Sequence, residues 1–102
     1  GPLINECGAI YNIKAPDFAM ARKAGEWQTY DIEFTAPEWK DGTKTKNARI
    51  TVYHNGTLIH NNVEIPQQTG AGAAEAPGMR RLRLQDHGHP IRYRNIWIEN
   101  LP

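Results

Sequence analysis

The dipeptide Asn55-Gly56 places the tightest constraint on what this chain can fold into. Asn-Gly suits a two-residue type I′ turn, because both residues tolerate the positive φ angles that this turn requires. The stretches on either side, 49–54 and 57–60, are rich in β-branched residues, which favour extended strands. The sequence therefore predicts a β-hairpin centred on this turn, with 63–65 extending its second strand as far as Pro66.

Further strands are expected on both sides of this hairpin. Residues 27–34 alternate strictly, with Tyr30, Ile32 and Phe34 on one face and polar side chains on the other, which indicates a half-buried strand. The other expected strands run through 7–11, 79–85 and 91–98, and loops are expected at 40–47, with a turn at Asp41-Gly42, and at 67–78. No stretch has a sustained helical period, so the predicted fold class is all-β, an antiparallel β-sandwich.

The composition excludes several classes of protein. The 102 residues are expected to form one domain, 1–102, in which Gly1-Pro2 is typical of a tag remnant. No apolar run is long enough to cross a bilayer, and a net charge of +1 gives no general electrostatic attraction for nucleic acid. Neither a membrane nor nucleic acid is therefore expected as a partner. The single cysteine, Cys7, excludes an intrachain disulfide and cysteine-based metal sites. Because so few strands leave open sheet edges, a homo-oligomer is expected.

Four blocks of the sequence resemble one known family. In chain order they are CGAIY at 7–11, GEWQTYDI at 25–32, ARITVYHNG at 48–56, and LQDHG at 84–88 with RNIWI at 94–98. Together they resemble the 3-keto-disaccharide hydrolase family, and the resemblance runs in order over nearly the whole chain. It implies a concanavalin A-like, laminin G-like jelly-roll sandwich that acts on oxidised sugars in periplasmic or secreted bacterial proteins.

The family domain is longer than this chain, and the blocks present here look like its C-terminal half. Two functions are therefore expected. The first is a carbohydrate-active domain that binds or cleaves 3-keto-glycosides. The second is a non-catalytic half-domain that dimerises to complete its sandwich and keeps only a sugar-binding or structural role. No cofactor is expected for either function.

Candidate catalytic residues gather where the expected final hairpin turns. His87 is the first candidate, because a histidine titrates near neutral pH and can abstract or donate a proton at a sugar carbon or glycosidic oxygen. Its neighbour Asp86 is the alternative base. Gln85 and Arg83 share the face of His87 on a regular strand and are expected to bind the substrate. The competing interpretation is that these residues only cap the loop through hydrogen bonds to its backbone.

Two arginines alternate along the returning strand. Arg92 and Arg94 can hydrogen-bond sugar hydroxyls or stabilise an enolate formed next to a ketone, and the alternative is an ordinary solvated face. The run 86–89 also contains two imidazoles and a carboxylate, which can hold a divalent ion. Its spacing is not diagnostic and no remote third ligand is evident, so no metal site is predicted.

Other residues able to carry chemistry favour structural interpretations. Simple pairing across the turn places His54 and His60 on opposite faces of the hairpin, where they cannot form one site. Asp31 and Glu33 lie on one strand face, as glycosidase acids do, but sheets expose such pairs routinely. Among the aromatic residues, Trp39 is the one expected to be exposed, because it lies in a polar loop.

Overall fold

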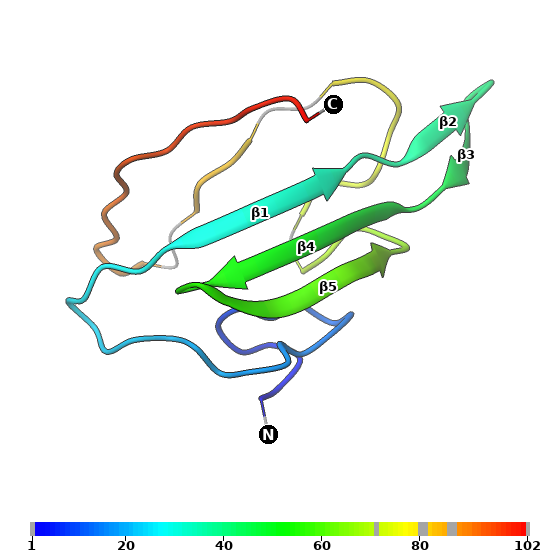
Figure 1. The fold of residues 1–102 in the computed structure, drawn as a ribbon. Helices are drawn as coiled ribbons and strands as arrows, with labels where there is room; N and C mark the ends of the chain where they lie inside the picture. The colour runs from blue at the N-terminus through cyan, green and yellow to red at the C-terminus, as the bar shows by residue number, and fades with distance from the viewer. Residues whose placement is uncertain (1, 71, 80–81, 86–87, 102) are drawn as a thin grey trace.

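The computed structural model of this chain describes residues 2–70, 72–79, 82–85 and 88–101. Its strands are β1 (Tyr30–Thr35), β2 (Glu38–Lys40), β3 (Thr43–Lys46), β4 (Ala48–His54) and β5 (Thr57–Ile65). They form a three-stranded sheet in the order β1-β4-β5 and a two-stranded sheet of β2 and β3, and every pair is antiparallel (Figure 1). None of the described residues is helical. The fold is therefore all-β and antiparallel, as predicted, with the architecture of a half-length sandwich.

The hairpin of β4 and β5 confirms the strongest sequence prediction. Asn55 and Gly56 have φ angles of 51° and 81°, the two positive values that a type I′ turn requires. β5 continues to Ile65 and ends at Pro66, also as predicted. The Asn55 side chain donates a hydrogen bond of 2.7 Å to the carbonyl of Met20, so the turn is also tied to the segment that precedes β1.

Beyond the turn, β5 does not keep simple register with β4. His60 lies opposite Val52 rather than opposite Thr51, because register shifts on both sides of Val52 insert extra residues into β5. One of the inserted positions, Asn62, has a φ of 50°. Each extra residue turns the following side chains to the other face of a strand. His60 consequently joins His54 on one face, and the expectation that they lie on opposite faces is wrong.

Two other segments differ in part from the sequence prediction. The alternating strand begins at Tyr30 rather than at residue 27. The turn at Asp41-Gly42 is correct, but the residues beside it form the short hairpin of β2 and β3 where a loop was expected. Asp41 and Gly42 have φ angles of 52° and 78°, so this turn has the same backbone preference as the Asn55 turn.

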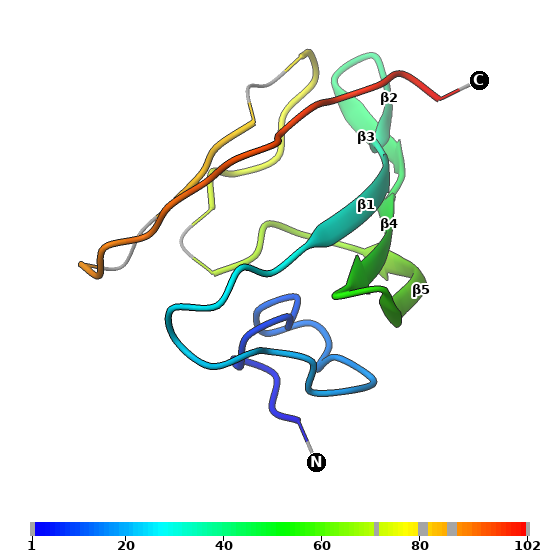
Figure 2. The ribbon, with the colours of Figure 1, turned by 60° about the vertical axis from the view of Figure 1, so that its left-hand side comes forward.

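The expected final hairpin is not a pair of strands in the described residues. Neither 82–85 nor 91–98 has strand pairing, and 7–11 has only an isolated bridge between Ile10 and Lys14. The two C-terminal arms are extended and meet near the loop at 88–90 (Figures 1 and 2). A side-chain contact joins them: the Tyr93 hydroxyl donates a hydrogen bond to the carbonyl of Gln85. In a β-ladder the donors would be backbone amides.

The sheet has one covered and one bare face. Figure 2 shows the N-terminal segment, residues 2–29, and the chain after β5 on the same side of the sheet. The buried residues of this side are Ile10, Ala48, Val52, Ile59, His54 and His60. On β1, however, Tyr30, Ile32 and Phe34 remain 47%, 57% and 56% exposed. The strand is therefore exposed on both faces and not half-buried as expected.

Candidate functional site

An open cleft separates the sheet from the chain that follows β5. Its volume is about 1230 Å³. The sheet side is lined by Phe34, Ala48 and Ile65, and Trp39 of β2 borders it. The opposite wall comes from residues between 67 and 85. An apolar cleft with an aromatic border and a few polar groups is the common form of a small-molecule site.

The polar groups of this cleft include two of the residues that the sequence singled out. Arg83 and Gln85 both contribute to its wall, next to the apolar side chain of Leu82. The two catalytic candidates, Asp86 and His87, lie outside the described residues. The structure thus brings Arg83 and Gln85 to the cleft. In the sequence, His87 follows Gln85 by two positions.

The two predicted arginines of the last arm do not line the cleft. Arg94 places its guanidinium carbon 3.8 Å from the ring centre of Trp27, which is a cation–π contact. Arg92 is exposed. Arg94 therefore ties the C-terminal arm to the residues just before β1, a role that the sequence pattern did not indicate.

A lysine that sequence reasoning missed holds the far wall of the cleft. Lys44 of β3 forms an ion pair of 2.8 Å with Glu75 and donates a second hydrogen bond of 2.7 Å to the carbonyl of Pro66. Its side chain is only 21% exposed. Two contacts from one ammonium group fix both ends of the 66–75 stretch to β3. The only sequence signal was opposite charge in two loops, which is too common to identify a pair.

The exposure of the aromatic and acidic residues can be compared with the sequence prediction. Trp39 is partly buried at the cleft, whereas Trp97 is 75% exposed, so the expectation that Trp39 would be the exposed tryptophan is wrong. Asp31 and Glu33 are exposed on the face of β1 opposite Ile32, as the solvated-face interpretation predicted.

At the other end of the sheet, the structure assembles a second polar cluster that sequence reasoning rejected. His54 and His60 are both fully buried. The His54 ring stacks on Tyr30 with 4.3 Å between ring centres. Burial lowers the pKa of His54, and the positive charge of Arg22 lowers it further. Burial, followed by the hydrogen bond with Cys7, raises the pKa of the Tyr30 hydroxyl. The two histidine side chains are enclosed, whereas Tyr30, Cys7 and Arg22 at the border of the cluster are exposed.

The described residues contain no group of three or more His, Cys, Asp and Glu side chains able to hold a metal ion. His89 is exposed, and its two neighbours in the predicted set, Asp86 and His87, are outside the described part of the chain. Within those same described ranges there is also no helix long and apolar enough to cross a membrane.

Comparison with known proteins relates the whole chain to sugar-cleaving enzymes. The sequence profile of a family described as the 3-keto-alpha-glucoside-1,2-lyase-like domain matches residues 1–99. A crystal structure of a protein provisionally described as a glycosyl hydrolase, from Parabacteroides distasonis ATCC 8503, is similar with a TM-score of 0.63 and 34% sequence identity. The similarity covers 71% of this chain and 31% of that one. The curated proteins contain no match to this chain. These findings support a carbohydrate-related function.

Proposed function

The chain belongs to the family of 3-keto-alpha-glucoside-1,2-lyase-like domains, and from this premise we propose that it binds 3-keto-glycosides in the cleft and takes part in their cleavage. The observation that carries the proposal is the lining of the cleft. Phe34 and Trp39 offer aromatic surface to the C–H face of a sugar ring, and Arg83 and Gln85 offer hydrogen bonds to its hydroxyl or keto oxygens. The chain spans 31% of the length of the similar crystal structure. That this chain has a cleavage activity like that of a whole protein is therefore proposed as well.

The proposed chemistry follows from the ketone. A 3-keto group acidifies the neighbouring C–H bond, so a base can remove that proton and leave an enolate. The electron pair then forms a carbon–carbon double bond as the glycosidic C–O bond breaks, and the leaving oxygen takes up a proton. We assign the proton transfers to His87, with Asp86 as the alternative base. Arg83 supplies positive charge near the enolate oxygen. Direct hydrolysis of the same bond is the competing route.

The experiment that tests catalysis compares two histidines that are two positions apart in the sequence. His87→Ala is expected to lower kcat for a 3-keto-glucoside by about 10²–10⁴-fold, the usual contribution of a general acid or base. The matched control is His89→Ala, which removes an exposed histidine from the same loop and is expected to leave kcat within about twofold. Equal turnover by the His87→Ala variant and the unaltered protein would refute the assignment.

Binding is tested separately, because a domain can bind a sugar without cleaving it. Arg83→Ala and Gln85→Ala are expected to weaken binding of a 3-keto-glucoside by roughly tenfold each, measured by calorimetry, since each removes hydrogen bonds worth about 1 kcal/mol. Arg49→Ala is the control, because Arg49 lies outside the cleft and bonds Asn62 instead. Unchanged affinity in both cleft variants would move the sugar site elsewhere.

The second candidate function is a non-catalytic half-domain that dimerises. It is favoured by the exposed side chains of Tyr30, Ile32 and Phe34 on β1, which is also an open edge of the sheet. An edge strand with an exposed apolar face can pair with another chain. Light scattering tests this candidate: a monomer of 11.5 kDa at all concentrations would refute it. A periplasmic or secreted location is likewise proposed from the family, and cell fractionation tests it.

A further inference from the structure

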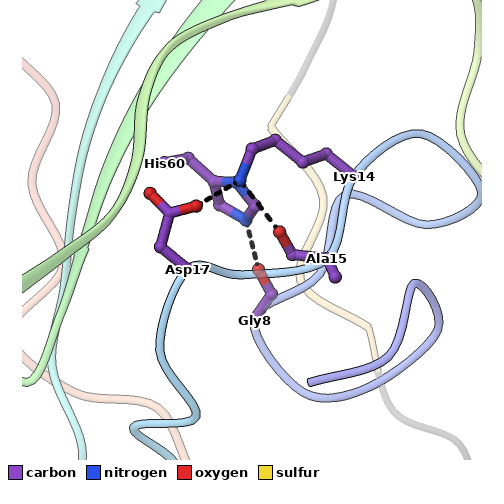
Figure 3. Close-up of polar contacts among 5 residues, drawn as sticks. All are labelled: Gly8, Lys14, Ala15, Asp17 and His60. Carbon is purple, nitrogen blue, oxygen red and sulfur yellow. Dashed lines mark hydrogen bonds and ion pairs between the residues drawn. The ribbon is translucent and has the colours of Figure 1, made fainter. Parts of the chain in front are cut away.

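His60 holds the N-terminal segment against the sheet through one hydrogen bond. Its Nε2 lies 2.6 Å from the carbonyl oxygen of Gly8 (Figure 3). A carbonyl can only accept, so Nε2 carries the proton and Nδ1 of the neutral ring is a bare lone pair. That Nδ1 is buried and has no hydrogen-bond partner among the residues that the structure describes. The ring is therefore held in one neutral tautomer, with no group placed to accept a second N–H.

His54 repeats this arrangement on the neighbouring strand. Its Nε2 lies 2.9 Å from Oε1 of Gln28, and the same oxygen accepts the backbone N–H of Arg22 at 3.0 Å. A backbone N–H can only donate, which fixes that atom of Gln28 as the oxygen and makes His54 Nε2 the donor. The Nδ1 of His54 is also buried, and in the described part of the chain it has no partner. It faces Gly8, 3.6 Å from the point that a Cβ would occupy there.

Both rings thus contact the segment that precedes β1, from different strands. Other contacts hold the same segment in place: the backbone N–H of Asp17 donates to the carbonyl of Ile59 at 3.0 Å, and Asn55 bonds the carbonyl of Met20. The buried core under this segment consists largely of Val52 and Ile59. Lifting the segment would expose these two side chains to water.

The charged groups around the two rings would not stabilise an added positive charge. Around His60, Lys14 and Asp17 form an ion pair of 2.6 Å, so the Asp17 carboxylate is already engaged (Figure 3). Around His54, the neighbours that titrate or carry charge are Arg22 and Tyr30, the latter bonded to Cys7. Protonating Nδ1 of His54 would bury an N–H that has no acceptor among the described residues, and would add a positive charge near Arg22.

We propose that His54, with His60 as a second anchor, forms an acid-sensitive latch, which holds residues 8–28 on the sheet while the His54 imidazole is neutral and releases them as the medium becomes acidic. Release of the segment exposes His54 of β4 to water, where its ring can take up a proton. Release is therefore a local opening of the N-terminal segment, and the β1-β4-β5 sheet remains paired. This device is independent of the proposed sugar chemistry, because neither histidine lines the cleft.

The direction of the pH dependence follows from linkage. The pKa of His54 is lower in the closed state than its ordinary value of 6.5, so the open state binds more protons below that pH. The closed state is thus fully favoured above pH 6.5 and loses its advantage as the pH falls toward the lowered pKa. For each histidine that gains a proton on release, the opening equilibrium constant rises roughly tenfold per pH unit.

Hydrogen exchange on the intact chain, corrected for the intrinsic rate, measures this opening constant between pH 7.5 and pH 5. We expect the amide of Asp17 to open at least tenfold more often at pH 5, while the ladder amides of β4 change less than threefold. His54→Gln and His60→Gln keep a donor in place of Nε2 but cannot titrate, and together they should flatten the pH dependence. His89→Gln is the matched control, since it removes an exposed histidine and should leave the dependence intact.

Two results would overturn the latch: a pH-independent opening constant for Asp17 in the unaltered chain, or an unchanged slope in the double variant. If the double variant does not fold, nitrogen NMR of the unaltered protein decides the question. The latch requires the Nε2–H tautomer in both rings and a His54 titration midpoint below 6.5. A midpoint at or above 6.5, or a proton on Nδ1 at neutral pH, refutes it.

Discussion

The two ends of the β1-β4-β5 sheet are built differently although the same strands pass through both. At the closed end, residues 8–28 cover β4 and β5 so completely that Ile59, His54 and His60 have no exposed surface. At the open end, Phe34 faces the cleft and remains 56% exposed. The closed end is sealed by chain that immediately precedes the sheet, whereas the open end is bounded by long, irregular chain that follows it.

This difference indicates which end specifies the fold and which is available for function. Burial of apolar side chains is the main contribution to the stability of a folded protein. The closed end therefore contributes most of the stability of this fold. A cleft needs surface that the fold leaves uncovered, and the open end supplies that surface beside Arg83 and Gln85.

Truncating one covered and one exposed isoleucine of the sheet should give the largest difference. Ile59→Ala is expected to lower the free energy of unfolding by about 2–5 kcal/mol, because it leaves a cavity in a fully buried site. Ile32→Ala, at a position that is 57% exposed, should change it by less than about 0.5 kcal/mol. Urea unfolding measures both. If Ile59→Ala does not fold, Ile59→Val replaces it, with an expected loss of about 0.5–1.5 kcal/mol. Equal losses at the covered and the exposed position would contradict the contrast.

Two glycines with nearly the same backbone angle separate packing from backbone strain. Gly8 and Gly25 have φ angles of 90° and 88°, but a Cβ on Gly8 would lie 3.1 Å from Ile59 Cδ1, whereas a Cβ on Gly25 would meet nothing within 4 Å. Both alanine variants suffer the same strain. Gly8→Ala should therefore cost about 1–3 kcal/mol more than Gly25→Ala, through overpacking alone. Matching unfolding midpoints would show that the closed end is loosely packed.

The two lysines of β3 sharpen the comparison at the cleft. Lys44→Met should lower stability by about 1 kcal/mol, because it breaks two contacts of a largely covered ammonium group. Lys46→Met breaks an ion pair with Glu38 that is mostly exposed and should cost less than about 0.5 kcal/mol. Proteolysis within 67–78 should accelerate only in the Lys44 variant. Acceleration in both variants would mean that Lys44 does not hold the cleft wall.

The smallest effect is expected where the last arm touches the rest of the chain. Arg94→Ala removes the cation–π contact with Trp27 and should cost about 0.5 kcal/mol. It should also shift the indole N–H resonance of Trp27 in an NMR spectrum. Arg92→Ala, two residues earlier on the same arm, is the control and should leave that resonance in place. A shift in both spectra, or in neither, would contradict the contact between Arg94 and Trp27.

Sequence reasoning succeeded where local chemistry dominates. The Asn55 and Asp41 turns, the end of β5 at Pro66 and the antiparallel all-β class all follow from residues close together in the chain. It failed where partners are remote. The final arms have alternating sequence but no strand pairing in the described residues, because alternation shows that a stretch can form a strand and not that a neighbouring edge is available.

The candidate site divides in the same way. Arg83 and Gln85, which strand spacing placed on the face of His87, line the cleft, while Arg94 packs on Trp27 instead. Lys44 was missed because its partner Glu75 is thirty-one residues away. Spacing along a strand gives the face of a side chain, but the position of that strand relative to the cleft depends on the loops that carry it.

The histidines show most clearly what belongs to the sequence and what belongs to the tertiary structure. By itself the sequence determined the hairpin and its turn, because the positive φ angles of Asn55 and Gly56 are a local property. Only the tertiary structure decided that His54 and His60 share one buried face. That outcome required the inserted residues in β5 and the carbonyl of Gly8, fifty-two positions from His60. A one-residue change of register costs little locally, and the packing of distant chain selects between the two faces.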